Sequence, residues 1–213
     1  MPAPLLSDLI DPATTALVTQ ECQGAVIGPN AQLPQLAEEA RHTAVPNIAR
    51  LLLAARSSGV NVVHCLVVRR PDGRGSNRNA RLLAAAKSFG GALTPGSEGA
   101  TLLPELGPYP TDLILNRWHG LGPMGGTDLD SVLRNLGVTT IVGVGVSVNV
   151  AITNFVMDAV NSGYQFVLPR DAVAGIPREY ADSVIDNTLS LLATVVTSEA
   201  VVETWAASAR TRR

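Results

Sequence analysis

The sequence predicts an α/β domain of the three-layer, doubly wound type with a six-stranded parallel sheet, and two observations carry that prediction. Short apolar runs rich in β-branched residues alternate along the chain with segments of helical period, which is typical of parallel strands joined by helices. The length of 213 residues and a hydrophobic content of 46% suit one domain, residues 1–213, with a sizeable core. Right-handed crossovers then place helices on both faces of the sheet.

Six apolar runs are the expected strands of this sheet. The connections between them keep the strands parallel, so their carboxyl ends should meet at one edge, where such sheets bind ligands. In chain order the runs are Thr15–Thr19, Val60–Val68, Asp112–Leu115, Thr140–Gly145, Tyr164–Leu168 and Ala193–Thr197.

The first long helix is indicated by a single apolar face. Ile48, Leu51, Leu52 and Ala55 recur at i, i+3, i+4 and i+7, which is the spacing of one side of a helix. Gly59 follows this face and is expected to end the helix, because glycine readily adopts the left-handed conformation that closes a helix.

Further helices are expected after the second strand. A polar, glycine-rich loop over Arg69–Asn79 precedes a short alanine-rich helix that is expected from Ala80 to Lys87. Thr127 is a candidate N-cap for the helix after the third strand, with Asp130 at its capping-box position. Three more helices are expected. One begins near Ile152 and a second covers Val184–Leu192, each with an apolar stripe, and a terminal helix covers Ser198–Ala207.

The composition excludes several classes of function. A formal net charge of −2 argues against a nucleic-acid or anionic-membrane surface, and we interpret Arg210–Arg213 as a solvated tail. No apolar stretch approaches the roughly 20 residues that span a bilayer, and Met1–Leu6 lacks the pattern of a secretory signal. Two cysteines, Cys22 and Cys65, do not make a disulfide framework. We therefore expect a cytoplasmic protein without a nucleic-acid or membrane partner.

Cofactor and metal motifs are incomplete. Gly143-Val144-Gly145 lacks the third glycine of a dinucleotide fingerprint and follows the fourth strand instead of the first. The glycine-rich segment Gly120–Gly126 lacks the Gly-Lys-Thr/Ser ending of a P-loop. His42, His64 and His119 show no ligand spacing, and His64, inside an apolar strand, is expected to be hydrogen-bonded there. We therefore expect neither a cofactor nor a metal.

Three residues follow the carboxyl ends of predicted strands. Glu21 follows the first strand and Arg117 the third, and Ala151 follows the fourth through the turn Gly145–Ala151. A strand that breaks into a tight turn and then a helix is how α/β enzymes present a reacting group at a helix N-terminus. We expect the three residues to converge on one pocket.

The motifs around these positions resemble those of a known family. The first strand ends in Glu21-Cys22-Gln23, the third in Asn116-Arg117-Trp118, and the fourth runs into Gly145-Val146-Ser147. Together with Gly126-Thr127-Asp128-Leu129 and Arg170-Asp171-Ala172, they resemble the isochorismatase-like hydrolase superfamily over nearly the whole chain. The resemblance implies the isochorismatase-like fold and a cis peptide bond between Val146 and Ser147.

The resemblance places the family's catalytic Asp, Lys and Cys at Glu21, Arg117 and Ala151, so all three depart from the usual set. A covalent acyl-enzyme needs an activated thiolate, which Ala151 cannot supply. Isochorismatases proper also carry a small residue there, and they hydrolyse a vinyl ether with a proton from the Asp and with water. The resemblance thus implies a hydrolase of a small organic, anionic substrate without a thiol intermediate, in which Glu21 is the acid or base.

Arg117 has two interpretations. As a charge anchor beside Glu21, it would favour the ionised carboxylate and lower the pKa of Glu21. It could instead clamp a substrate carboxylate in a bidentate pair. The backbone amides of Asn149–Ala151 are candidate donors to the substrate or to water. The other candidates for substrate binding come from the same motifs and are Gln23, Trp118, His119, Val146, Ser147 and Asn149.

Other functions remain open. The chain could be a catalytically silent small-molecule-binding protein that kept the pocket and lost the chemistry. Cys22 could be a relocated nucleophile, although strand alternation turns it away from Glu21 and Gln23 and favours a buried, inert thiol. The loop Arg69–Arg81 either binds an anionic substrate or is simply solvated. The resemblance also implies a homodimer or a homotetramer.

Overall fold

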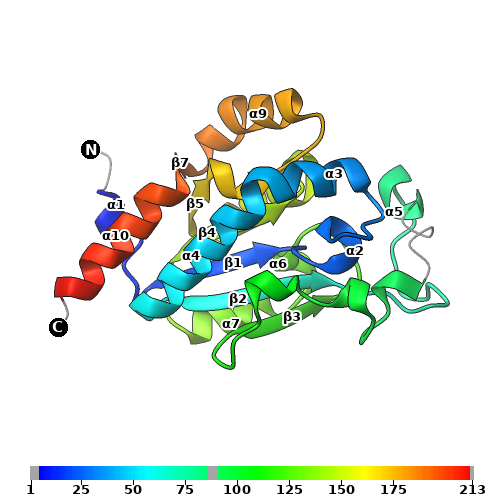
Figure 1. Ribbon diagram of the computed structural model, residues 1–213, viewed down its shortest axis with the longest axis horizontal. Coiled ribbons are helices and arrows are strands. Elements are labelled where there is room, and N and C mark those ends of the chain that lie inside the picture. Colours follow the sequence, from blue (N-terminus) through cyan, green and yellow to red (C-terminus); the bar gives the residue numbers. More distant parts are fainter. Residues whose placement is uncertain (1–4, 86–90, 212–213) are drawn as a thin grey trace.

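A parallel sheet lies between two layers of helices in the computed structural model, which describes residues 5–85 and 91–211 (Figure 1). The strand order is β3-β2-β1-β4-β5-β7, and every pairing is parallel. A seventh strand, β6 (Val173–Ala174), pairs with the end of β4. The predicted three-layer, doubly wound fold is confirmed, and β6 was missed because two residues leave no periodic signal.

The six long strands overlap the six predicted runs. Their bounds are β1 Thr15–Gln20, β2 Asn61–Val67, β3 Leu113–Arg117, β4 Thr140–Val146, β5 Gln165–Pro169 and β7 Thr194–Val196. The largest difference that affects the site is in β3, which runs two residues beyond the predicted end. Arg117 is therefore the last residue of a strand, where its backbone pairs with Val67 of β2.

Each face of the sheet has its own hydrophobic core, because successive side chains of a strand point to opposite faces. On one face, Leu17 of β1 belongs to a cluster with Ile48 of α4 (Val45–Ser58) and Trp205 of α10 (Ser198–Thr211). On the other face, the neighbouring Val18 belongs to a cluster with Phe155 of α8 (Thr153–Asn161). These two cores hold the helical layers against the sheet and fix the positions of the strand ends.

The first long helix is preceded by an irregular turn. The π-helical turn Ala40–Ala44 joins α3 (Pro34–Glu39) to α4. Pro46 lies in the first turn of α4 and lacks the backbone N–H of a regular helix, which accounts for the irregular pattern before it. Gly59 ends α4 with a φ of 77°, as predicted.

The remaining helices are mostly short, and two predictions about them need comment. Their bounds are α1 Leu6–Leu9, α2 Gly24–Ile27, α5 Arg81–Ala85, α6 Pro123–Gly126, α7 Leu129–Asn135 and α9 Arg178–Asn187. The predicted helix Ala80–Lys87 corresponds to α5, and its last two predicted residues lie outside the described residues, as do the last two residues of the predicted basic tail.

The predicted capping box of the helix after β3 is wrong in its second residue, Asp130, whereas the Thr127 hydroxyl does bind a backbone amide of the first turn. The N-cap is Asp128, and the Thr127 hydroxyl accepts a hydrogen bond from the amide of Leu129 at 3.0 Å. The Asp130 carboxylate does not reach back to the cap, because it accepts a 3.0 Å hydrogen bond from the hydroxyl of Tyr164 and pairs with Arg134. A tertiary partner thus overrides the local capping pattern.

A buried polar network crosses the sheet below the strand ends. His64 of β2 is fully buried, and its ring nitrogens contact Thr19 Oγ1 at 2.8 Å and Asp112 Oδ2 at 3.2 Å. Arg56 of α4 donates to both carboxylate oxygens of Asp112, with the shorter contact at 2.7 Å. The His64 side chain is hydrogen-bonded, as predicted, and burial lowers its pKa, although hydrogen bonding to Asp112 opposes the shift.

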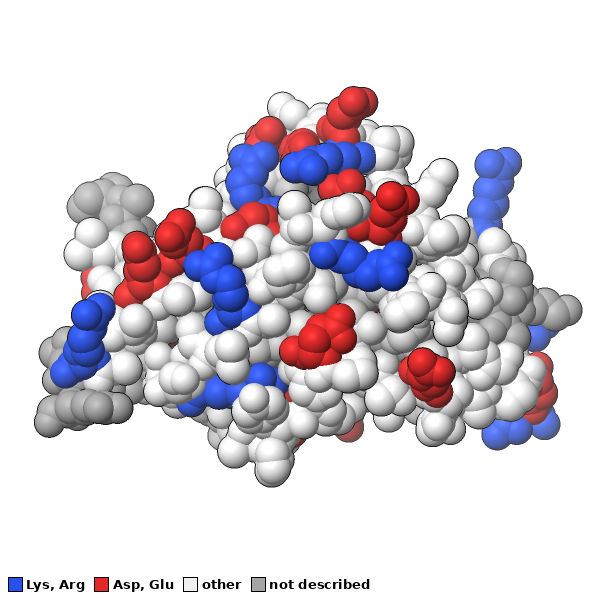
Figure 2. All heavy atoms as spheres, viewed as in Figure 1, with Lys and Arg blue, Asp and Glu red and all other residues white. Residues whose placement is uncertain are grey.

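Basic and acidic side chains are intermixed on the face of the molecule that Figure 2 shows, and much of the surface between them is uncharged. Among the described helices, none is long and apolar enough to cross a membrane. Within residues 5–85 and 91–211 there is also no group of three or more His, Cys, Asp or Glu side chains that could hold a metal ion.

Candidate active site

A cavity of about 230 Å³ opens at the carboxyl edge of the sheet. Glu21 follows β1, Val67 and Arg117 are the last residues of β2 and β3, and Ser147 follows β4. The chain leaves β1 toward β2 on one side and later returns as β4 on the other, so this edge is the switch point of the sheet, where doubly wound domains bind ligands. Ala151, at the start of the helix after β4, also lines the cavity.

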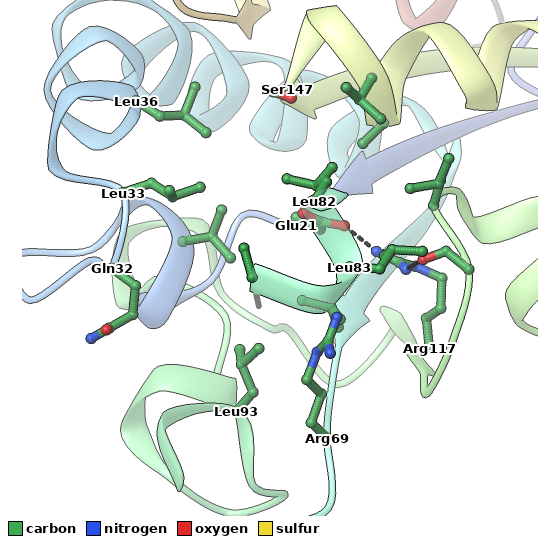
Figure 3. A pocket seen from close by; sticks show the side chains of 17 residues that line it. Glu21, Gln32, Leu33, Leu36, Arg69, Leu82, Leu83, Leu93, Arg117 and Ser147 are labelled. Carbon is green, nitrogen blue, oxygen red and sulfur yellow. Dashed lines mark hydrogen bonds and ion pairs between the residues drawn. The ribbon is translucent and has the colours of Figure 1, made fainter. Parts of the chain in front are cut away.

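Glu21 is held in an unusual backbone conformation. Its φ is 55°, and it is the one described residue other than glycine with a positive φ. Its amide still donates to the Cys65 carbonyl at 2.9 Å, which continues the β1–β2 ladder by one residue before the chain turns away. A non-glycine residue in this region costs on the order of 1–3 kcal/mol, and such strain gathers at functional sites. The turn directs the Glu21 side chain into the cavity (Figure 3).

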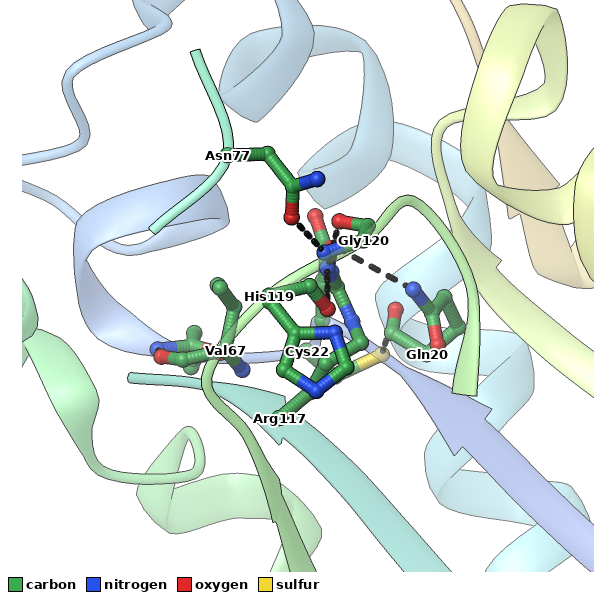
Figure 4. A network of polar contacts seen from close by, with 9 residues as sticks. Gln20, Cys22, Val67, Asn77, Arg117, His119 and Gly120 are labelled. Carbon is green, nitrogen blue, oxygen red and sulfur yellow. Dashed lines mark hydrogen bonds and ion pairs between the residues drawn. The ribbon is translucent and has the colours of Figure 1, made fainter. Parts of the chain in front are cut away.

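Glu21 and Arg117 form an ion pair. Arg117 Nη2 donates to Glu21 Oε1, which also accepts a 3.1 Å hydrogen bond from Gln20 Nε2. The other terminal nitrogen, Nη1, donates to the carbonyl of Gly120 and, at 3.4 Å, to that of His119 (Figure 4). Arg117 is only 4% exposed, so its guanidinium is enclosed by protein acceptors.

The two carboxylate oxygens of Glu21 differ in their hydrogen bonding. Within the described part of the chain, no group donates a hydrogen bond to Oε2, whereas Oε1 has two donors. Since Glu21 lines the cavity, Oε2 is the oxygen available to a bound molecule or to water.

The electrostatics at Glu21 differ from the expectation. Burial raises the pKa of the Glu21 carboxyl, while the charges of Arg117 and Arg69 oppose that shift without reversing it. The expected lowering of this pKa by Arg117 is therefore present but is outweighed by the loss of water around the carboxyl. A carboxyl with a raised pKa carries its proton closer to neutral pH, as a proton donor must.

The turn after β4 forms the wall opposite the carboxyl. Gly145 has a φ of 116°, and a side chain there would bring its Cβ within 2.2 Å of the Gln20 carbonyl oxygen, so only glycine allows β4 to approach β1 this closely. The peptide bond between Val146 and Ser147 is cis, as the resemblance implies. The amide of Val150 donates to the Ser147 carbonyl at 3.3 Å, so one of the three expected amide donors is already engaged.

The structure brings Glu21, Arg117, Ser147 and Ala151 together around the cavity. It does not place the other expected substrate-binding side chains there. Gln23 is buried and makes hydrogen bonds to both backbone groups of Val67, at 2.7 Å and 2.9 Å, which ties the end of β1 to the end of β2.

Four further candidates also lie away from the cavity lining. Trp118 is 43% exposed and His119 is exposed, because the chain turns outward after β3. Val146 is buried in the core. Asn149 donates to the carbonyl of Ile176 at 2.6 Å, so its amide supports the neighbouring loop.

Neither cysteine lines the cavity among the described residues. Cys22 is fully buried within the core, and burial, with a smaller contribution from the Glu21 charge, raises the pKa of its thiol far above the usual range. Cys65 lies in the core on the other face. The buried environment of Cys22 is unsuited to a nucleophile.

Reasoning from the sequence leaves one cavity residue open and misses others. Arg69 is the first residue of the loop Arg69–Arg81, for which the sequence leaves both anion binding and a solvated loop open, and it lies two residues beyond β2 and lines the cavity. Most leucines of the cavity come from α5 and from the segment around α3, while Leu93 and Leu121 lie in the loops before and after β3. These segments carry no motif, and only the tertiary fold brings them to the strand ends.

Comparisons with known proteins agree with this architecture. Residues 15–200 match the model of the Isochorismatase domain. A ureidoacrylate amidohydrolase, RutB, of Methylobacterium radiotolerans is 28% identical over 176 residues, which cover 76% of this chain and 68% of that protein.

Solved structures show the same fold. A cysteine hydrolase from Pseudomonas syringae pv. phaseolicola superposes with a TM-score of 0.82 at 24% identity, over 98% of this chain and 100% of the other. An isochorismatase family protein from Desulfovibrio vulgaris superposes with a TM-score of 0.76 at 28% identity, over 91% and 99% of the two chains.

Proposed function

The chain belongs to the isochorismatase family, and we propose that it hydrolyses a small organic substrate without a covalent thiol intermediate. The observation that supports this most directly is a carboxyl oxygen, Glu21 Oε2, which has no hydrogen-bond donor among the described residues and lines a cavity without a cysteine. Ala151 stands in the same cavity, where the family resemblance places the nucleophilic thiol.

Glu21 is the proton-transfer group in this proposal. Its raised pKa favours a carboxyl that gives its proton to the substrate, after which water adds to the carbon made electron-poor. The proton that this water loses returns to Glu21. The hemiketal so formed then breaks its ether C–O bond, with the hydroxyl proton passing to the leaving oxygen, and releases an alcohol and a carbonyl compound, so one water is consumed and the carboxyl is regenerated. A vinyl ether can react in this way, because protonation of the double bond replaces attack by a side-chain nucleophile.

Arg117 acts as the charge anchor of Glu21. Its contacts with Glu21 Oε1 and with two backbone carbonyls hold the carboxyl in one orientation. When Glu21 has given up its proton, the guanidinium balances the new negative charge in a buried setting. These contacts leave Arg117 poorly placed to clamp a substrate carboxylate as well.

Turnover by purified protein tests the proposal. The substrates would be isochorismate and related enol ethers, and ureidoacrylate because a relative is named for it. The Glu21→Gln variant should lower kcat/KM by at least about a hundredfold, since general acid–base catalysis contributes roughly that much. The matched control is Glu105→Gln, which changes an exposed carboxylate outside the cavity lining.

The alternative is a silent binding protein of the same fold. Ala151 favours it, because loss of a nucleophile is also what loss of function would leave. The same assay separates the two: absence of turnover on every substrate, together with tight binding of a carboxylate ligand, would favour the silent binder.

A further inference from the structure

The cavity wall is mainly apolar apart from its charged end. Leu33, Leu36, Leu82, Leu83 and Leu93 line it, and in Figure 3 their side chains surround the space in front of Glu21. Leu82 is 52% exposed and Leu33 is 38% exposed, so apolar side chains face open space at this site. Exposed apolar surface that lines a concavity marks a place where an apolar group binds.

A second guanidinium enters the same cavity. Arg69 approaches from beyond the end of β2 (Figure 3). Among the described residues, no group accepts a hydrogen bond from its side chain, and its Nε is buried without a partner. A buried guanidinium nitrogen without an acceptor is costly, so Arg69 is a group that lacks its counterpart.

The other charges of the cavity do not supply that counterpart. The carboxylate of Glu21 is bound by Arg117 and Gln20, and no ion pair joins it to Arg69. Arg117, by contrast, has three oxygen acceptors of its own. Of the two arginines, Arg69 is therefore the one with donors to offer to a ligand.

The neighbouring arginine has a different environment. Arg70 is exposed and forms an ion pair with Asp72 at 2.8 Å, and it does not line this cavity. It lines an adjacent cavity, which shares Arg69 and Leu83 with the first. Arg70 thus provides a matched control for the charge of Arg69.

We propose that Arg69 binds the carboxylate of the substrate, and that the substrate carries an apolar body which packs against the leucines of the cavity. This inference deepens the proposed function and rests on it for the statement that the bound acid is the substrate. A carboxylate offers two oxygens to the planar guanidinium, which is the geometry that arginine recognises best. The apolar body would cover Leu33 and Leu82, and its reacting group would lie toward Glu21.

Binding of three probes by calorimetry tests the inference without turnover. Phenylacetate has both features, 2-phenylethanol lacks the charge, and acetate lacks the apolar body. We expect phenylacetate to bind most tightly. Arg69→Met should weaken phenylacetate binding by about tenfold to a hundredfold, the value of a charge-assisted hydrogen bond, and should leave 2-phenylethanol unchanged.

Control variants make the outcome specific. Arg69→Lys should keep part of the preference for phenylacetate, and Arg70→Met should keep all of it. Thermal melts establish that each variant is folded. The role of Arg69 would be overturned if 2-phenylethanol bound as tightly as phenylacetate, or if Arg69→Met kept the preference for phenylacetate. The role of the leucines would be overturned if acetate bound as tightly as phenylacetate. Glu21→Gln should retain phenylacetate binding. Binding by Arg69 can therefore be confirmed even if the proposed catalysis by Glu21 is wrong.

Discussion

Replacement of Arg117 by methionine tests the electrostatic design of the site. The side chains of Arg117 and Glu21 are 5% and 17% exposed, which makes this a largely buried ion pair. Removing one partner of a buried pair costs about 3–5 kcal/mol, because the other charge is left uncompensated. We expect a loss of that size in the free energy of unfolding at pH 8.

The loss should depend on pH in a defined direction. Burial already raises the pKa of Glu21, and removal of Arg117, which lowers it, raises it further. A carboxyl whose pKa is higher in the folded state than in the unfolded state loses stability as the pH rises through the folded pKa. The deficit of the variant should be smallest below the folded pKa of wild-type Glu21, which itself lies above the ordinary value of 4.5, and should grow by up to about 1.4 kcal/mol per pH unit once the pH passes that folded pKa.

Urea unfolding followed by circular dichroism at a series of pH values measures this deficit. Arg70→Met is the control, because Arg70 and its partner Asp72 are both exposed, and it should leave the unfolding curves unchanged. An Arg117→Met variant as stable as the wild type at pH 8, or a deficit that does not change with pH, would show that Arg117 does not compensate a buried charge on Glu21.

Three further predictions follow from other parts of the structure. Ala151→Cys should make the chain reactive to iodoacetamide, which mass spectrometry detects, whereas Cys22 is buried; equal labelling of wild type and variant would show that position 151 does not face the cavity. The pKa of His64 is lower in the folded state than in the unfolded state, so the wild type loses stability as the pH falls below about 6.5, the pKa of an unfolded histidine. His64→Gln should make this loss smaller in urea unfolding. Parallel pH profiles of the two proteins would contradict this. Gly145→Ala should destabilise the fold more than Gly137→Ala in thermal melts, because both have positive φ but only at Gly145 would the new Cβ meet a backbone oxygen at 2.2 Å; equal melting temperatures would be inconsistent with that contact.

Much of the fold could be predicted from the sequence because its signals are local. The apolar runs gave the six long strands, and the left-handed Gly59 ended its helix where expected. The predictions that failed concern features that depend on partners distant in the chain. The Asp130 carboxylate bonds to Tyr164 instead of the helix cap, and β6 pairs with the end of β4.

The candidate site likewise contains residues that local sequence could predict and residues that only the tertiary fold brings there. Glu21 and Arg117 could be placed together because parallel strands bring their carboxyl ends to one edge. Gln23 lies next to the site in sequence, but its amide is occupied by the backbone of Val67, which no local pattern reveals. The leucines of the cavity were not predicted, because they come from segments that reach the site only through the tertiary fold.

The most direct test of hydrolysis without a thiol is to measure the turnover of a variant that has no cysteine. Cys22→Ala combined with Cys65→Ala removes both thiols of the sequence, and alanine keeps both core positions apolar. We predict that the folded double variant keeps the kcat/KM of the wild type, and that adding Glu21→Gln to it removes the activity. Loss of turnover in the folded double variant would mean that a cysteine takes part in the reaction.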